Sequence, residues 1–283
     1  MKTAQNTFQR NMLLIYSNKL LRTLSLDCNY LPCLSSINFI SKFDKNINIV
    51  LKKMNSNFFL TIVIRNLLIN FAKFFLYFIQ LIILKLFFRS YSKKKISENI
   101  FLSHSFGQSH FEDNYFGKIK ISLKKLKLQK KFNSYYLNHS SFFDISFNDN
   151  VLSGLNLSYF EIIKLFFLLI KLFFFVLSKI FFEKNKLVRK LLIYLLGNII
   201  SKSSFKTFLT MDEFILALST HRTKKVFFTF EGHIYEKYLI SKLKNKRNKI
   251  KTFGYFHTGI TDGLNSFIVN NLKQFLPSTI LCI

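Results

Sequence analysis

The sequence predicts an α/β protein in which a parallel sheet is flanked by helices, with two long, apolar, amphipathic helices beside it. A strand–helix–strand segment within residues 225–265 predicts the sheet. Two apolar segments, residues 58–88 and 159–182, confine their polar side chains to one arc of a helical wheel. The chain has 283 residues, enough to form one or two domains.

The first apolar segment, residues 58–88, predicts an amphipathic helix. Its longest stretch without a charge, Phe74 to Leu84, is about half of the ~20 residues that a membrane-spanning helix needs. The polar side chains share one arc of the wheel: Arg65, Asn66, Asn70, Lys73, Tyr77 and Gln80. Packing in a globular core, lying in a membrane interface and spanning a membrane remain open for this helix.

Two short strands are predicted between the apolar helices, at residues 100–104 and 133–137. The basic amphipathic segment between them, residues 118–131, indicates a solvated face. On the second apolar helix, the polar side chains again share one arc: Glu161, Lys164, Lys171, Ser178 and Lys179. Its other faces need a large apolar partner, which could be the first helix, a bilayer interface or a further part of the protein.

Two more helices are predicted before the central segment. Residues 185–200 form a basic helix that we expect to break near Gly197 and Asn198. A second helix covers residues 210–219, with Thr210 as its N-cap and two acids, Asp212 and Glu213, near its start, where the helix dipole favours them.

The central segment reads as strand, helix and strand at residues 226–230, 233–244 and 250–256. Such a βαβ unit makes its two strands parallel, so both end at the same edge of the sheet. That edge is where open α/β sheets bind ligands. We therefore expect the residues that follow the two strands to converge there: Glu231, Gly232, His233, His257, Thr258, Gly259 and Thr261.

Two motifs in the chain resemble a known family. FEGHIYEKYLISKL followed by KTFGYFHTGI is similar to a pattern in bacterial surface carbohydrate biosynthesis proteins, and FLSHSFGQSHFEDNYFGKI, which contains His104, resembles a second segment of that family. These proteins are glycosyltransferase-like, of the two-domain GT-B kind. The chain departs from the family at Tyr235, where Trp is usual, and at Phe256, where Gln is frequent.

The resemblance implies a Rossmann-like N-terminal half of a transferase of surface polysaccharide biosynthesis. It implies Glu231 and His257 as catalytic residues, with substrate contacts from His104, Gly232, His233, Thr258 and Gly259. The partners would be a carbohydrate acceptor and a nucleotide-sugar donor, the latter bound through a C-terminal domain that this chain lacks. The chain alone would then be inactive. No cofactor or metal is expected, since no phosphate-binding glycine motif or metal-ligand spacing occurs.

Each candidate residue also has a structural interpretation. Glu231 could cap the helix that follows it. Glu236 has no lysine at helical spacing, which favours a solvated surface carboxylate over one wall of a cleft. His104 and His257 could be hydrogen-bonded residues at strand ends.

The expected organisation follows from these elements. Residues 1–57 are a weakly patterned segment, and residues 58–200 are an α/β region that contains the two apolar helices. Residues 201–276 form a Rossmann-like βαβ core with a further helix at 267–275. Residues 277–283 are the start of the missing domain.

Charge and cysteine content suggest where the protein acts. The formal net charge is +28, but the lysines are scattered through every segment, which favours a membrane surface over nucleic acid. Three cysteines without a CxxC motif indicate a reducing compartment, so we expect a cytoplasmic protein on the inner face of the cell membrane. Two alternatives remain: a non-enzymatic integral membrane protein with two apolar helices, and a basic nucleic-acid-binding protein.

Overall fold

Every strand in the described part of the chain belongs to one parallel sheet. The computed structural model describes residues 59–87, 97–105, 116–128, 131–138, 151–220, 223–230, 234–244, 250–256 and 276–282. The strands are β1 (Asn99–Ser105), β2 (Phe132–Asn138), β3 (Val151–Leu152), β4 (Lys225–Thr229), β5 (Lys251–Phe256) and β6 (Thr279–Cys282). The predicted α/β class and its parallel sheet are therefore confirmed. The expected segment 1–57 and helix 267–275 lie outside the described residues.

The strand order is β3-β2-β1-β4-β5-β6, and every neighbouring pair is parallel. This is the order of dinucleotide-binding Rossmann sheets. The chain moves outward from β1 to β3 and then returns to place β4 beside β1. Strands from each of the expected regions 58–200, 201–276 and 277–283 join this one sheet.

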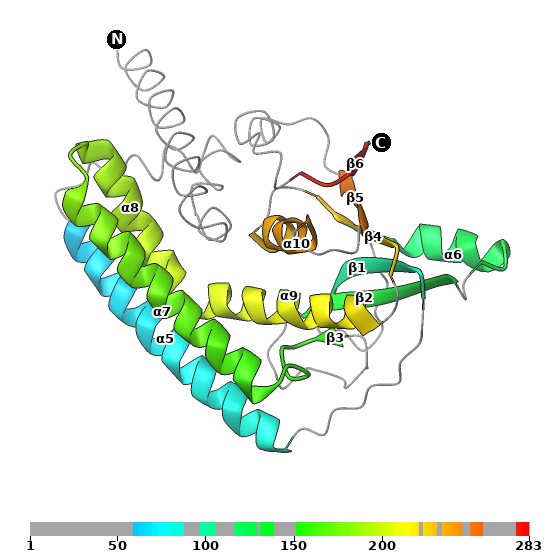
Figure 1. The fold of residues 1–283 in the computed structure, drawn as a ribbon, viewed down its shortest axis with the longest axis horizontal. Coiled ribbons are helices and arrows are strands. Elements are labelled where there is room, and N and C mark those ends of the chain that lie inside the picture. Colours follow the sequence, from blue (N-terminus) through cyan, green and yellow to red (C-terminus); the bar gives the residue numbers. More distant parts are fainter. Residues whose placement is uncertain are drawn as a thin grey trace, which may run out of the picture.

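Helices cover both faces of the sheet and extend beyond it (Figure 1). The helix α9 (Lys202–Thr220) packs against α10 (Ile234–Lys244), while α6 (Gly117–Lys125) lies on the other side of the sheet. Three helices form a layer that runs past the end of α9: α5 (Phe59–Phe87), α7 (Tyr159–Phe182) and α8 (Lys186–Ile199). The two long apolar helices predicted from the sequence are therefore confirmed.

The two faces of the sheet carry different kinds of side chain. Toward α9 and α10 the strands bury aliphatic residues and Phe228, and Tyr135 packs edge-on against Phe214 of α9 with ring centroids 5.5 Å apart. The opposite face is a row of phenylalanines from neighbouring strands, in which Phe227 lies 5.2 Å from Phe101 and 4.8 Å from Phe253. Successive side chains of a strand point to opposite faces of the sheet. Each short strand therefore packs against α9 and α10 with one set of side chains and contributes to the opposite face with the other.

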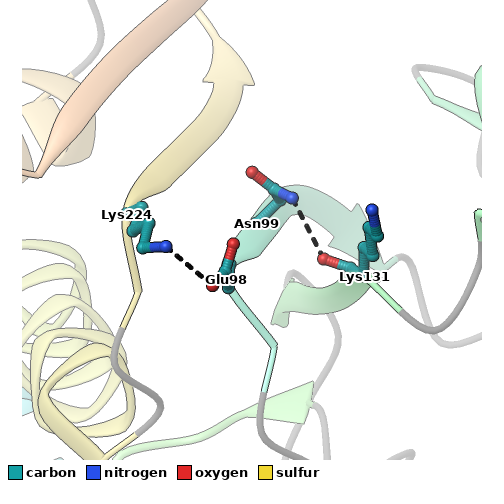
Figure 2. Close-up of polar contacts among 4 residues, drawn as sticks. All are labelled: Glu98, Asn99, Lys131 and Lys224. Atoms are coloured by element: carbon teal, nitrogen blue, oxygen red, sulfur yellow. Dashed lines mark hydrogen bonds and ion pairs between the residues drawn. The ribbon is translucent and has the colours of Figure 1, made fainter.

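The amino edge of the sheet is closed by polar contacts between its strands (Figure 2). Lys224, before β4, forms a 2.7 Å ion pair with Glu98, before β1. Asn99 donates its side-chain amide to the carbonyl of Lys131 at 3.1 Å. The hydrogen bond from Lys224 and its charge lower the pKa of Glu98. These contacts tie β1 to both of its neighbours, on the edge opposite to the expected site.

Two helix boundaries differ from the prediction. The helix α9 begins at Lys202, where Ser201 accepts the backbone N–H of Ser204 at 3.1 Å and so acts as the cap. Thr210 is inside the helix and donates to the carbonyl of Lys206 at 3.0 Å, so its prediction as N-cap was wrong. The helix α8 continues through Gly197 to Ile199 without the expected break. Packing against α5 and α7 outweighs the weak helix propensity of one glycine.

The helix α5 turns one edge of its polar arc toward the protein, while Arg65, Asn66, Lys73 and Gln80 of that arc are exposed. Phe74, Tyr77 and Leu81 are buried, and Asn70 on the same side donates to the carbonyl of Gly197 at 2.8 Å. Most of its apolar surface is instead exposed. Both α5 and α7 contain segments that are long and apolar enough to cross a membrane, with only 17% and 28% of the most apolar windows buried. The outer surface of α5 therefore combines exposed apolar side chains with exposed polar ones, unlike that of a helix whose outer face is uniformly polar.

Close packing at Gly254 on β5 leads to a stability prediction. A Cβ atom added there would lie 2.7 Å from Cβ of Phe230 and 2.9 Å from Cγ of Pro277, whereas one added at Gly197 in α8 would meet nothing within 4 Å. Gly254→Ala should lower the free energy of unfolding by about 1–3 kcal/mol through overpacking. Gly197→Ala should raise it by about 0.5–1 kcal/mol through helix propensity. Urea unfolding of the full chain measures both, and equal effects of the two variants would contradict the packing at Gly254.

Candidate functional site

The strand order of this sheet reverses between β1 and β4. The helices that follow these two strands in the chain, α6 and α10, lie on opposite sides of the sheet (Figure 1). Such a topological switch point is where open α/β sheets bind their ligands. His104, near the end of β1, and Thr229, the last residue of β4, lie on the two sides of this point.

A hydrogen-bonded cluster joins the two strands to α10. Nε2 of His104 lies 3.1 Å from Oγ1 of Thr229 and 3.2 Å from the hydroxyl oxygen of Tyr235. The two hydroxyl oxygens are 2.8 Å apart. His104 and Thr229 are buried, with 8% and 2% of their surfaces exposed, and Tyr235 is partly buried. We call these three residues the His104 cluster.

The tautomer of His104 sets the direction of these hydrogen bonds. A protonated Nε2 donates to the hydroxyl oxygens, whereas an unprotonated Nε2 accepts a hydroxyl proton. Either hydroxyl can donate to the other. In both tautomers the cluster holds the Tyr235 hydroxyl in place between β1, β4 and α10.

A pocket of about 490 Å³ opens beside the cluster. It lies between α5, the carboxyl end of β2, the first turns of α9 and Tyr235 of α10. Three lysines line it: Lys73 from α5 and Lys202 and Lys206 from α9. The other lining residues are mostly polar: Asn70, Leu137, Asn138, Ser201, Ser203, Thr207, Thr210 and Tyr235. We call this cavity the lysine pocket.

The described residues that line the lysine pocket include three positively charged side chains and no acid. Burial, and to a smaller extent the charge of Lys202, lowers the pKa of Lys206. The first turn of α9 contains no acid, and the positive end of the helix dipole adds to the lysine charges. Nζ of Lys202 lies 5.3 Å from the ring centre of Tyr77, a cation–π contact between α9 and α5.

Of the predicted site residues, only His104 is among those that the structure describes. It lies behind the wall of the lysine pocket and reaches it through Tyr235, so its contribution is to position that side chain. Glu231, Gly232, His233, His257, Thr258 and Gly259 lie outside the described residues. They directly follow Phe230 after β4 and Phe256 at the end of β5, and they stay predictions.

The surface interpretation of Glu236 was wrong. Its side chain is completely buried, as are the next five residues of α10 from Lys237 to Ser241 at 7% exposure or less. The helix lies on the sheet and against α9, so neighbours cover more than one of its faces. A helical wheel of α10 alone does not show the second neighbour.

Glu213 is a central residue that the sequence prediction misplaced. It lies in the middle of α9, fully buried, and both carboxylate oxygens accept hydrogen bonds from the loop after β3. Oε2 accepts the backbone N–H groups of Ser153 at 2.8 Å and Gly154 at 2.6 Å, and Oε1 accepts the backbone and side-chain N–H groups of Asn156. Burial raises the pKa of Glu213 despite these donors.

Other residues of the site carry weak signals in the sequence. An acid inside the apolar run MDEFILAL was the available sign of a buried role for Glu213. In the sequence, Tyr235 is distinctive only as a departure from a family pattern. The lysines of the pocket come from two helices far apart in the chain, and no local pattern connects them.

Comparisons with known proteins do not identify the chain. No protein-family model, curated protein sequence or solved structure matches it in the comparisons that we made. The resemblance to surface carbohydrate biosynthesis proteins therefore stays a prediction. Within the described residues, no group of three or more His, Cys, Asp and Glu side chains could hold a metal ion.

The Glu213 carboxylate should be required for the loop after β3. Glu213→Leu leaves the buried N–H groups of Ser153 and Gly154 without their acceptor, which costs about 1–3 kcal/mol for each group. Glu213→Gln should cost less, because one oxygen remains and the amide of Asn156 can turn to present its own oxygen. Thermal and urea unfolding of the three proteins gives the order wild type, Gln, Leu. A Leu variant as stable as the wild type would contradict the role of these hydrogen bonds.

Proposed function

We propose that this chain is a glycosyltransferase-like protein of surface polysaccharide biosynthesis, which lies on a membrane surface and holds a carbohydrate acceptor at the carboxyl edge of its sheet. The observation that carries the proposal is the position of the lysine pocket. It lies at the switch-point edge and includes Lys73 of α5, the helix whose apolar surface is exposed. The two motifs that resemble surface carbohydrate biosynthesis proteins support the choice of chemistry.

Sugar binding fits the groups at this edge. Carbohydrate hydroxyls need donors and acceptors in fixed positions, and the His104 cluster holds the Tyr235 hydroxyl in this way at the wall of the pocket. Transfer to an acceptor hydroxyl also needs a base, and cationic groups that face the leaving phosphate. Glu231 and His257 remain the proposed catalytic residues, and the lysines supply the positive charge.

Association with a membrane surface is supported by the outer faces of α5 and α7. The rings of Phe75 and Phe167 both contact Phe166, at 6.3 and 5.6 Å, and so connect the two exposed surfaces. On α7 the exposed phenylalanines alternate with Lys164 and Lys171, which are exposed as well. Lysines between apolar side chains can extend to anionic headgroups, so this surface favours lying in the interface over crossing the bilayer.

A negative charge introduced into this surface should release the chain from vesicles. Phe75 and Phe167 are 45% and 61% exposed, and Ile121 of α6, away from the helix layer, is 58% exposed. Burying one phenylalanine contributes about 1.5–3 kcal/mol. Phe75→Glu and Phe167→Glu should therefore each weaken flotation with phosphatidylglycerol–phosphatidylcholine vesicles by about tenfold or more. Ile121→Glu changes the charge equally and should have little effect, and equal losses in all three would contradict this orientation.

Carbohydrate binding tests the proposed chemistry. Saturation-transfer NMR with a panel of hexose and hexosamine oligosaccharides should detect binding to the full chain in nanodiscs. Tyr235→Phe removes the hydroxyl that is proposed to bind the sugar, together with its contacts to His104 and Thr229, and should weaken binding by about 3- to 10-fold. The matched control is Tyr136→Phe, because that hydroxyl accepts from Lys120 at 2.7 Å on the other face of the sheet. The absence of binding to every oligosaccharide, or equal effects of the two variants, would reject the proposal.

A second candidate is a non-enzymatic integral membrane protein, which the length of α5 and α7 favours. Such a protein would resist extraction by alkaline carbonate and expose protease-sensitive loops on both sides of the membrane. Release by carbonate would exclude it and agree with the interfacial position.

A further inference from the structure

Two lysines of the lysine pocket lie at the start of a helix, where positive charges destabilise the helix. Lys202 and Lys206 stand one helical turn apart at the start of α9, and like charges at this spacing weaken a helix. The N-terminus of a helix favours acids, yet the first turn of α9 has none. Lys73 adds a third positive charge from α5. No acid is found among the described residues that line the pocket, so the protein keeps a cationic cavity without a carboxylate in its described walls.

The geometry of the pocket fits an anion with several oxygens. Hydroxyl groups of Ser203, Thr207 and Tyr235 lie around the lysines, and the first turn of α9 directs backbone N–H groups toward its own end. A carboxylate offers one charge and two oxygens, whereas a phosphate offers up to two charges and three oxygens. Burial, and to a smaller extent the charge of Lys202, lowers the pKa of Lys206, and an anion in the pocket would favour the charged form of this lysine.

We infer that the lysine pocket binds a phosphate or diphosphate group through Lys73, Lys202 and Lys206. The volume of about 490 Å³ is sufficient for such a group together with part of the molecule that carries it. This inference deepens the proposed function, on which it rests for the carbohydrate, by adding an anionic group to the substrate.

The position of Lys73 indicates which molecule carries the phosphate. Lys73 belongs to α5, where Phe71 and Phe75 beside it in the sequence are exposed. An amphiphile with its phosphate in the pocket could therefore place its apolar chain along the outer surface of α5. A phosphate on a lipid matches this arrangement, and a soluble phosphate ester matches only the pocket.

Pyrophosphate binding tests the pocket itself. Isothermal titration of the full chain in uncharged detergent should detect binding of inorganic pyrophosphate. Lys202→Met combined with Lys206→Met should lower the affinity at least tenfold. The matched control, Lys124→Met with Lys125→Met, removes two exposed charges from α6 and should change it less than twofold. Lys202→Gln alone alters an exposed side chain, so it tests the pocket even if the double variant fails to fold.

Lipid vesicles distinguish the source of the phosphate. Vesicles with phosphatidic acid should bind the wild type more tightly than phosphatidylcholine vesicles, and pyrophosphate should compete. Pyrophosphate binding without a preference for phosphatidic acid would overturn the lipid as carrier. No pyrophosphate binding, or equal losses in the pocket and control variants, would overturn the phosphate site. Carbohydrate binding without phosphate binding rejects this inference alone, and phosphate binding without carbohydrate binding rejects the proposed function alone.

Discussion

The burial of α9 on nearly all sides is the constraint on which the rest of the structure depends. Toward the helix layer, Phe205 lies against Phe74 of α5 and Phe166 of α7, with ring centroids 5.2 and 6.2 Å apart. Toward α10, Phe208 packs on Tyr238 at 4.2 Å, and Phe214 contacts the sheet. Since one helix is shared by the sheet and the helix layer, the lysine pocket at its start has a fixed shape. A membrane bound to the outer helices would thus be held in a fixed position relative to the lysine pocket.

Polar groups inside this packing hold the carboxyl edge in place. Glu213 accepts the N–H groups of the loop after β3, in which Gly154 adopts a φ of +86° that favours glycine. Tyr238 of α10 donates to Asp212 of α9 at 2.8 Å, and burial raises the pKa of that carboxyl group despite this donor and Lys242. Buried polar groups stabilise a fold only when they are hydrogen-bonded. The hydrogen bonds of Glu213 and Asp212 therefore fix the positions of the loop after β3 and of α10 relative to α9.

The elements themselves were largely predictable, because strand and helix patterns are local. The structure confirms the helix at residues 159–182 with the same bounds, and the strands of the βαβ segment within one residue of their expected ends. The site was less predictable. Glu236 was expected at the surface because a helical wheel shows one helix and not its neighbours. Thr210 was expected to begin a helix because the true start, at Lys202 after the cap Ser201, lies in a stretch without a strong apolar pattern.

What the sequence determined by itself is the α/β class, the parallel βαβ unit and the two apolar helices, since each follows from the spacing of side chains along a short segment. Only the tertiary structure decided which way those helices face. In the polar arc of α5, Asn70 and Tyr77 lie against α8 and α9, whereas Arg65, Asn66, Lys73 and Gln80 are exposed together with most of the apolar side chains of the helix. The His104 cluster was also a tertiary result, because its members are brought together by strand order. Contacts between residues more than a hundred positions apart depend on how the whole chain packs, and no local spacing records them.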